Sequence, residues 1–283
     1  MKPTFLLFVL LALASCQSNT PSKKILFSSG RNGNSDIFLM NTDGSDVTPI
    51  IKGTNEEWGA TFTDANNITF MRQIKDSVFR FSYNLSTKEE QKLTPLRGCY
   101  LDDKNVVYSK NGDYAFSCGL ELFLKKKDDE KFIKLNTGSR NTPNYLSWTF
   151  DGKKILYTDN LTGSNDVYAI DIETQSIENL TQSNSNDERG DLSPDGKWLV
   201  YSSNQHNAKD QDLFILNLET KEAENITNSS GYDLIGRWDL DGKSILYGSN
   251  KDGNWEIYRY VLADKSTVRL TNDAAFDGDP RVR

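Results

Sequence analysis

The stretch that decides the fold is Trp238-Asp239-Leu240-Asp241-Gly242-Lys243-Ser244-Ile245-Leu246-Tyr247, because its parts recur along the chain. An apolar triplet ending in an aromatic residue follows a polar turn, and an Asp usually lies six residues before the aromatic. The six triplets begin 43, 38, 49, 44 and 46 residues apart, which is the period of a four-stranded β-propeller blade. They are Ile25-Leu26-Phe27, Ile68-Thr69-Phe70, Val106-Val107-Tyr108, Ile155-Leu156-Tyr157, Leu199-Val200-Tyr201 and Ile245-Leu246-Tyr247.

Each triplet lies inside a larger unit of four short strands. A first strand such as 146–150 precedes the turn, a third such as 166–169 follows a polar loop, and a fourth lies near a pair such as Leu180-Thr181. The second and third strands are apolar on both faces, whereas a sheet exposed on one face would alternate. Blades packed face to face around an axis cover both faces. The sequence therefore predicts an all-β, six-bladed β-propeller with four-stranded antiparallel blades.

The phase of the repeat predicts how the ring closes. The chain enters at Lys23-Lys24-Ile25, already in a second strand, and residues 277–283 align with first strands such as 233–239. We therefore expect the C-terminal strand to complete the first blade, which removes an open sheet edge. Pro280 suits an innermost strand, because one edge of such a strand needs no hydrogen-bond donor.

The N-terminus carries a predicted targeting signal. Lys2 is followed by an apolar run from Phe5 to Ala14, too short for a membrane-spanning helix. The run ends in Leu13-Ala14-Ser15-Cys16, which resembles the lipobox of bacterial lipoproteins and implies cleavage before Cys16 and lipidation of its sulfur. The predicted organisation is a signal peptide (1–15), a lipidated cysteine with a tether (16–23) and the propeller (24–283). Gln17 is not the Asp that retains some lipoproteins in the inner membrane, so we expect the outer membrane, facing the periplasm.

The composition argues against nucleic acid as a partner. The chain has 33 Lys and Arg against 40 Asp and Glu, a net charge of −7, and no basic stripe. We expect a monomer that contacts the membrane only through its lipid.

Two cysteines remain in the predicted propeller, Cys99 and Cys118. An envelope location permits a disulfide between them. The strand assignment places them at the same end of one blade but on non-adjacent strands, about 9.6 Å apart, which is beyond easy bridging unless a loop bends in. The sequence therefore favours unpaired thiols and leaves the disulfide open.

The repeats resemble those of the TolB-type (WD40-like, PD40) propellers of bacterial envelope proteins. The residues that carry the resemblance are 192–197 and 238–247, with the partner segments 165–168 and 255–258. The resemblance covers 24–283 and implies a six-bladed propeller that binds an envelope protein or peptide. Blades two and three depart from the pattern, because no Gly follows Asp64 or Asp102.

Catalytic and metal-binding residues are poorly represented. The single histidine, His206, lies in a polar loop, and no Gly-x-Ser-x-Gly nucleophile elbow is present. A zinc site needs several His or Cys ligands. The loops 32–36, 160–166 and 250–254 contain oxygen ligands that could hold calcium. However, Asn, Asp and Gly are also good turn formers, so no metal or cofactor is assigned.

Charged residues gather at the predicted first strands, where loops from every blade approach the axis. We expect an acidic rim interleaved with arginine that receives a cationic or mixed-charge segment of a partner, with Trp58, Tyr145, Trp148 and Trp238 as aromatic anchors. The alternative is that the charges pair across neighbouring blades and the aromatics belong to the core. The rim candidates are Glu56, Glu57, Asp187, Glu188, Asp191, Asp233, Arg237, Asp277 and Arg281.

The sequence predicts a non-catalytic scaffold for protein or peptide binding at the axial face. One alternative is a carbohydrate-active enzyme, since some oligogalacturonate lyases resemble TolB-type propellers, but their metal site uses histidine ligands. Another is a lactonase-like propeller with calcium, which requires carboxylates that converge at the axis.

Overall fold

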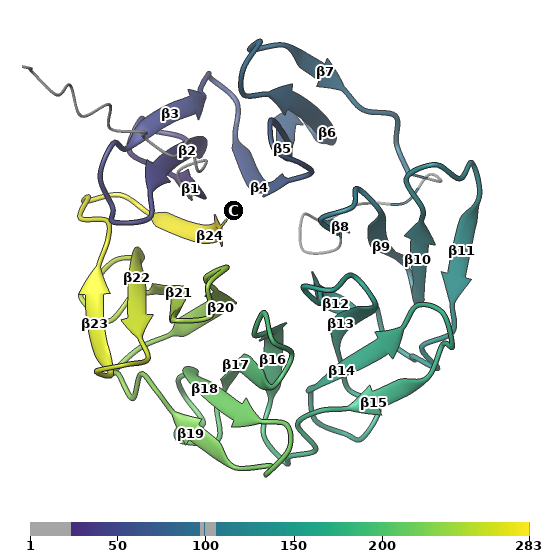
Figure 1. Cartoon of the computed structure of the whole chain (residues 1–283). Coiled ribbons are helices and arrows are strands. Elements are labelled where there is room, and N and C mark those ends of the chain that lie inside the picture. The colour runs from purple at the N-terminus through teal and green to yellow at the C-terminus, as the bar shows by residue number, and fades with distance from the viewer. Residues whose placement is uncertain (1–23, 97–98, 100–105, 283) are drawn as a thin grey trace, which may run out of the picture.

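The computed structural model describes residues 24–96, 99 and 106–282. These residues form six four-stranded antiparallel sheets arranged as blades around an axis (Figure 1). The predicted six-bladed propeller is confirmed. No helix that is long and apolar enough to cross a membrane occurs in the described ranges. The predicted signal peptide, Cys16 and the tether lie outside them.

Each blade runs from an inner strand beside the axis to an outer strand at the edge of the ring (Figure 1). Blade one is β24 (Asp277–Val282), β1 (Lys24–Ser29), β2 (Asp36–Asn41) and β3 (Thr48–Ile51). Blade two is β4 (Glu57–Phe62), β5 (Asn67–Ile74), β6 (Ser77–Asn84) and β7 (Glu90–Lys92). Blade three is β8 (Val106–Tyr108), β9 (Tyr114–Cys118), β10 (Glu121–Lys125) and β11 (Phe132–Leu135). Blade four is β12 (Asn144–Trp148), β13 (Lys154–Asp159), β14 (Asp166–Asp171) and β15 (Ile177–Asn179). Blade five is β16 (Asp187–Leu192), β17 (Trp198–Ser203), β18 (Asp212–Asn217) and β19 (Ala223–Asn225). Blade six is β20 (Asp233–Trp238), β21 (Ser244–Ser249), β22 (Glu256–Val261) and β23 (Ser266–Arg269).

The C-terminal strand closes the ring, as predicted. β24 pairs antiparallel with β1, so that Val282 lies opposite Ile25 and Asp277 lies opposite Ser29. Figure 1 shows β24 beside β1, so blade one combines the C-terminal strand with the first three strands of the described chain.

The core consists of layers between neighbouring blades. Along β13, Ile155 and Tyr157 pack toward blade three, whereas Leu156 packs toward Leu199 of blade five. Successive residues of one strand thus enter two different layers. This explains why the strands are apolar on both faces.

Each blade also contains one aromatic pair across its second and third strands. The ring centroids lie between 5.4 and 5.9 Å apart, a favourable distance for aromatic contact. The pairs are Phe27–Phe38, Phe70–Phe81, Phe116–Phe123, Tyr157–Tyr168, Tyr201–Phe214 and Tyr247–Tyr258.

The aromatic pair corrects the sequence assignment in blade three. The triplet pattern predicts Val106–Tyr108 as the second strand, but it is the inner strand β8, and the second strand is β9 with Phe116. The turn between them contains Gly112 at φ 87°, a conformation that glycine adopts without strain. With Phe116 in place of Tyr108, the aromatics are spaced 43, 46, 41, 44 and 46 residues apart, closer to a constant period.

The same shift explains the disulfide, for which the sequence expectation was wrong. Cys99 and Cys118 are bonded, with their Cα atoms 5.5 Å apart. Cys118 ends the second strand of the blade rather than lying on the third, so the distance of two strand spacings does not apply.

Five of the inner strands contain a β-bulge at the same place. In β4, β12, β16, β20 and β24, two residues lie opposite a single residue of the second strand, which is the repeat's aromatic. The first bulged residue has a left-handed φ between 53° and 62°. Such a bulge bends the strand and redirects the side chains that follow it. The bulged residues are Gly59, Tyr145, Arg189, Ile235 and Asp279.

Candidate binding site in the central channel

Four of the predicted rim carboxylates are internal to the ring. Glu57, Asp187, Asp233 and Asp277 begin their inner strands and are at most 1% exposed. Their backbone N–H groups donate to the carbonyl of the residue just before the preceding blade's third strand, at 2.7 to 3.0 Å. The expectation of an exposed acidic rim is therefore wrong for these residues, because they lie in the joints between consecutive blades.

The joint between blades four and five shows how such a carboxylate is accommodated. Ser183 donates its backbone N–H to Asp166 at 3.2 Å and its hydroxyl to Asp187 at 2.8 Å. Thr181, from the Leu-Thr pair of the repeat, also donates its hydroxyl to Asp166 at 3.0 Å. Buried polar groups are costly unless they are hydrogen-bonded, so this network is structural. The next joint repeats it, with Ser229 between Asp212 and Asp233.

The other two joints use arginine. Arg72 contacts Glu57 at 2.7 Å, and Arg31 contacts Asp277 at 2.6 Å. Burial nevertheless raises the pKa of Glu57 and of Asp277, against the lowering effect of the arginines. Each of these charge pairs lies within a single blade, blade two for Arg72 and Glu57 and blade one for Arg31 and Asp277. The two pairs therefore differ from the sequence alternative, in which charges pair across neighbouring blades.

Two rim candidates lie beside these joints. Glu56 is exposed and accepts the backbone N–H of Ser35 at 2.8 Å. Glu188 is half-buried, accepts the amide of Asn165 at 2.6 Å and pairs with Arg189. Both are engaged within the ring.

The remaining three candidates face a pocket in the central channel. Its volume is about 610 Å³, and it lies at the end of the inner strands, away from the joints. The second residue after each left-handed bulged residue, together with its counterpart in blade three, lines the pocket. These residues are Thr61, Val107, Ser147, Asp191, Arg237 and Arg281.

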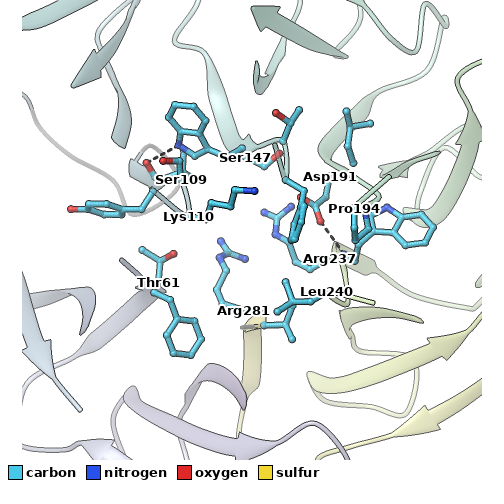
Figure 2. A pocket seen from close by; sticks show the side chains of 18 of the residues that line it. Thr61, Ser109, Lys110, Ser147, Asp191, Pro194, Arg237, Leu240 and Arg281 are labelled. Atoms are coloured by element: carbon cyan, nitrogen blue, oxygen red, sulfur yellow. Dashed lines mark hydrogen bonds between the residues drawn. The ribbon is translucent and has the colours of Figure 1, made fainter. Parts of the chain in front are cut away.

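Positive charge dominates the middle of this pocket. Figure 2 shows the side chains of Lys110, Arg237 and Arg281 pointing toward the centre of the channel from three different blades. Arg237 donates to the carbonyl of Gly236 at 3.4 Å, and Arg281 to that of Pro280 at 3.2 Å. Among the described residues, neither guanidinium has a carboxylate oxygen within 4.0 Å.

One carboxylate, Asp191, lies near these cations and is already engaged. It accepts the backbone N–H of Trp238 at 2.9 Å, an interaction drawn in Figure 2. Burial raises the pKa of Asp191, and Arg237 opposes this effect. Burial also lowers the pKa of Arg237 to about 10, with a further lowering by Arg281, so the guanidinium stays protonated at neutral pH.

The mouth of the pocket is apolar on three consecutive blades. Phe150, Pro194 and Leu240 occupy equivalent positions in the turns between first and second strands. Phe150 is 45% exposed and Leu240 is 39% exposed. The ammonium group of Lys110 lies 4.8 Å from the centre of the Phe150 ring.

The predicted aromatic anchors divide between wall and core. Trp148 lines the pocket and donates its indole N–H to the carbonyl of Val107 at 3.1 Å. Trp238 also lines it but is only 5% exposed. Tyr145 accepts from Arg189 at 2.7 Å, and Trp58 is half-buried in β4.

The candidates for catalysis and metal binding do not converge. His206 lies exposed in its loop. Within the described ranges, no three His, Cys, Asp or Glu side chains are grouped to hold a metal ion. In the loops 32–36 and 160–166, Asp36 and Asp166 accept hydrogen bonds from side chains of the same or neighbouring turns. The calcium alternative stays a prediction.

Comparison with known proteins agrees with this architecture. Residues 142–282 match a family described as the TolB beta propeller domain. The Tol-Pal system protein TolB of Francisella tularensis subsp. tularensis (strain WY96-3418) is 28% identical over 156 residues. That match covers 53% of this chain and 33% of the relative, so the chain spans about a third of the relative's length.

Two solved structures show the same fold at low identity. The crystal structure of TolB from Acinetobacter baumannii has a TM-score of 0.80 at 16% identity, covering 92% of this chain and 66% of that chain. An oligogalacturonate lyase in complex with manganese has a TM-score of 0.57 at 15% identity, covering 84% and 86%. At these identities the likeness concerns the fold alone.

Proposed function

Because this chain is a TolB-type β-propeller protein, we propose that it is a non-catalytic scaffold of the bacterial cell envelope that binds a protein or peptide at the mouth of its channel. One observation carries the proposal: the pocket of about 610 Å³ opens beside the exposed apolar side chains of Phe150 and Leu240. Binding sites are commonly concave and mostly apolar, with a few polar groups that set orientation. The family match and the name of the Tol-Pal relative support a protein as the partner.

Membrane attachment belongs to the same proposal. Lipid on Cys16 would hold the ring at the outer membrane, facing the periplasm, as a monomer. Metabolic labelling with an alkyne fatty acid should mark the wild-type chain but not a Cys16→Ala variant. A variant that still carries the label would refute lipidation at this residue.

Site-specific cross-linking in cells tests the binding face. A photoreactive amino acid at Leu240 lies at the channel mouth, whereas the same residue at Val268, which is 47% exposed on β23, lies on the outermost strand of the blade. We expect one defined envelope protein to be cross-linked from position 240 and not from position 268. Identical adducts from both positions, or none from position 240, would contradict a binding face at the channel mouth.

A further inference from the structure

The channel pocket places three cations around one space, and the described residues of its lining include fewer carboxylates than cations. Lys110 comes from blade three, Arg237 from blade six and Arg281 from blade one, and Figure 2 shows them pointing inward. Among the described residues that line the pocket, Asp64 and Asp191 are the two carboxylates. Asp64 accepts hydrogen bonds from Asn67 within its own turn, and Asp191 accepts the N–H of Trp238. The described part of the lining is therefore cationic, although the chain carries a net charge of −7.

This arrangement is costly without a ligand. Two guanidinium groups that face one space repel each other, and burial removes part of the water that would screen them. Two arginines at the blade joints, Arg31 and Arg72, each contact a buried carboxylate. Arg237 and Arg281 have no such partner among the described residues, so an anion supplied from outside would remove the repulsion.

The chemistry of the walls indicates which anion. A guanidinium matches the planar carboxylate, to which it can donate two parallel hydrogen bonds. The apolar side chains of Phe150, Pro194 and Leu240 line the same pocket as the cations, and the Lys110 ammonium lies 4.8 Å from the centre of the Phe150 ring. A ligand that satisfies both regions carries a carboxylate next to apolar groups, as a peptide does and as an acidic sugar does not.

Building on the proposed function, we propose that the pocket binds a carboxylate of the partner polypeptide, from an acidic side chain or a free C-terminus, with an adjacent apolar residue against Phe150 and Leu240. The expected ligand charge differs from the sequence prediction, in which an acidic rim interleaved with arginine receives a cationic or mixed-charge segment of the partner. The difference follows from the structure, since four of the acidic rim candidates are buried in the joints, whereas Arg237 and Arg281 face the channel.

Matched short peptides test the proposal on the full chain by isothermal titration calorimetry. Ac-Leu-Glu-Leu-amide and Ac-Leu-Gln-Leu-amide differ only in the side-chain charge, and Ac-Leu-Leu with a free or amidated C-terminus distinguishes the two sources of the carboxylate. We expect at least one acid to bind about tenfold or more tightly than its amide, because hydrogen bonds to charged groups are the stronger ones. The advantage should shrink as salt is added.

Two substitutions place the effect in the pocket. Arg281→Gln should remove most of the preference for the acid, while Arg281→Lys should retain part of it. Arg140→Gln removes the same charge at an exposed position outside the pocket and should leave the preference unchanged. Because the peptide pairs are compared on the wild-type chain, the test does not depend on the folding of any variant.

Three results would overturn the proposal. These are equal binding of acid and amide in both pairs, an equal loss in the Arg140→Gln variant, or binding of trigalacturonate with none of the peptides. If cross-linking from position 240 still identifies an envelope protein, such a result overturns the carboxylate and leaves the proposed function in place. If cross-linking also fails, both are refuted.

Discussion

Substitution of Gly190 by alanine should destabilise the ring, because the position has no room for one carbon atom. A Cβ at Gly190 would lie 2.5 Å from Val167 Cγ1 and 3.1 Å from Leu199 Cδ1. Carbon atoms in contact prefer about 3.5–4.0 Å, so Val167 would have to move by about 1 Å. Val167 and Leu199 are fully buried on strands of two blades, and overpacking of such a core costs about 1–3 kcal/mol. The loss corresponds to about 2–4 °C in melting temperature for each kcal/mol.

Urea denaturation followed by circular dichroism measures this loss, and two further variants identify its cause. Gly30→Ala is the control, because the nearest atom to its new Cβ lies 3.7 Å away, and we expect a change within about 0.5 kcal/mol. Val167→Ala removes the methyl groups that clash, so the double variant should be more stable than the sum of the single losses by at least about 0.5 kcal/mol. A wild-type midpoint for Gly190→Ala, or strictly additive losses in the double variant, would refute the steric explanation.

Three further predictions concern the closure, the joints and the disulfide. Deleting residues 277–283 removes the inner strand of blade one and the partner of Arg31, so the melting temperature of the whole ring should fall, and an unchanged melting curve would refute the closure argument. Burial raises the pKa of the Asp187 carboxyl, so the folded protein holds a proton there more tightly than the unfolded chain does. The stability that this proton contributes is lost as the pH rises from about 4 through the pKa of the folded protein. When the pH is lowered from 7 to 4.5, the unfolding free energy of the wild type should therefore rise relative to that of Asp187→Asn. A relative fall over this range would contradict a buried, desolvated carboxylate. Cys118→Ser removes a disulfide between residues 19 apart and should lower the free energy of unfolding by about 3 kcal/mol. Cys99 should then react with thiol reagents. A Cys99 thiol that already reacts in the oxidised wild type would contradict the disulfide.

The ring and its closure could be predicted because their signals are local in the sequence. The apolar triplet with its aromatic residue marks the second strand in five blades. Its spacing indicates four-stranded blades, and the number of triplets gives the number of blades. Blade three could not be assigned in this way, since its inner strand Val106–Tyr108 has the same local pattern. The turn containing Gly112 was the signal that distinguishes the two strands, because it precedes Phe116 as the Asp-Gly turns precede their aromatics.

The site was predicted only in part, because burial depends on residues from neighbouring blades. Asp187 is an acidic residue at the start of a strand in the sequence, and the hydroxyl of Ser183 that accommodates it inside the ring belongs to the linker before it. Arg237 and Arg281 were identified correctly as residues near the axis. Lys110 was missed because the shift in blade three hid its place in a turn, and Phe150 was missed because its exposure is visible only in the folded ring.

The bulges explain how one scaffold carries a specific pocket. Each bulge lies opposite an aromatic of the second strand, so its position is fixed by packing within the blade. The residue two positions after the left-handed bulged residue then faces the channel, whether it is polar or charged. Thr61 and Ser147 therefore line the same pocket as Arg237 and Arg281. The joints between consecutive blades lie at the other end of the inner strands, where the carboxylates are buried. Under the proposed function, the structural joints and the binding pocket would therefore lie at opposite ends of the same strands. It follows that exchanging residues at the channel position should change what the pocket binds without opening the ring.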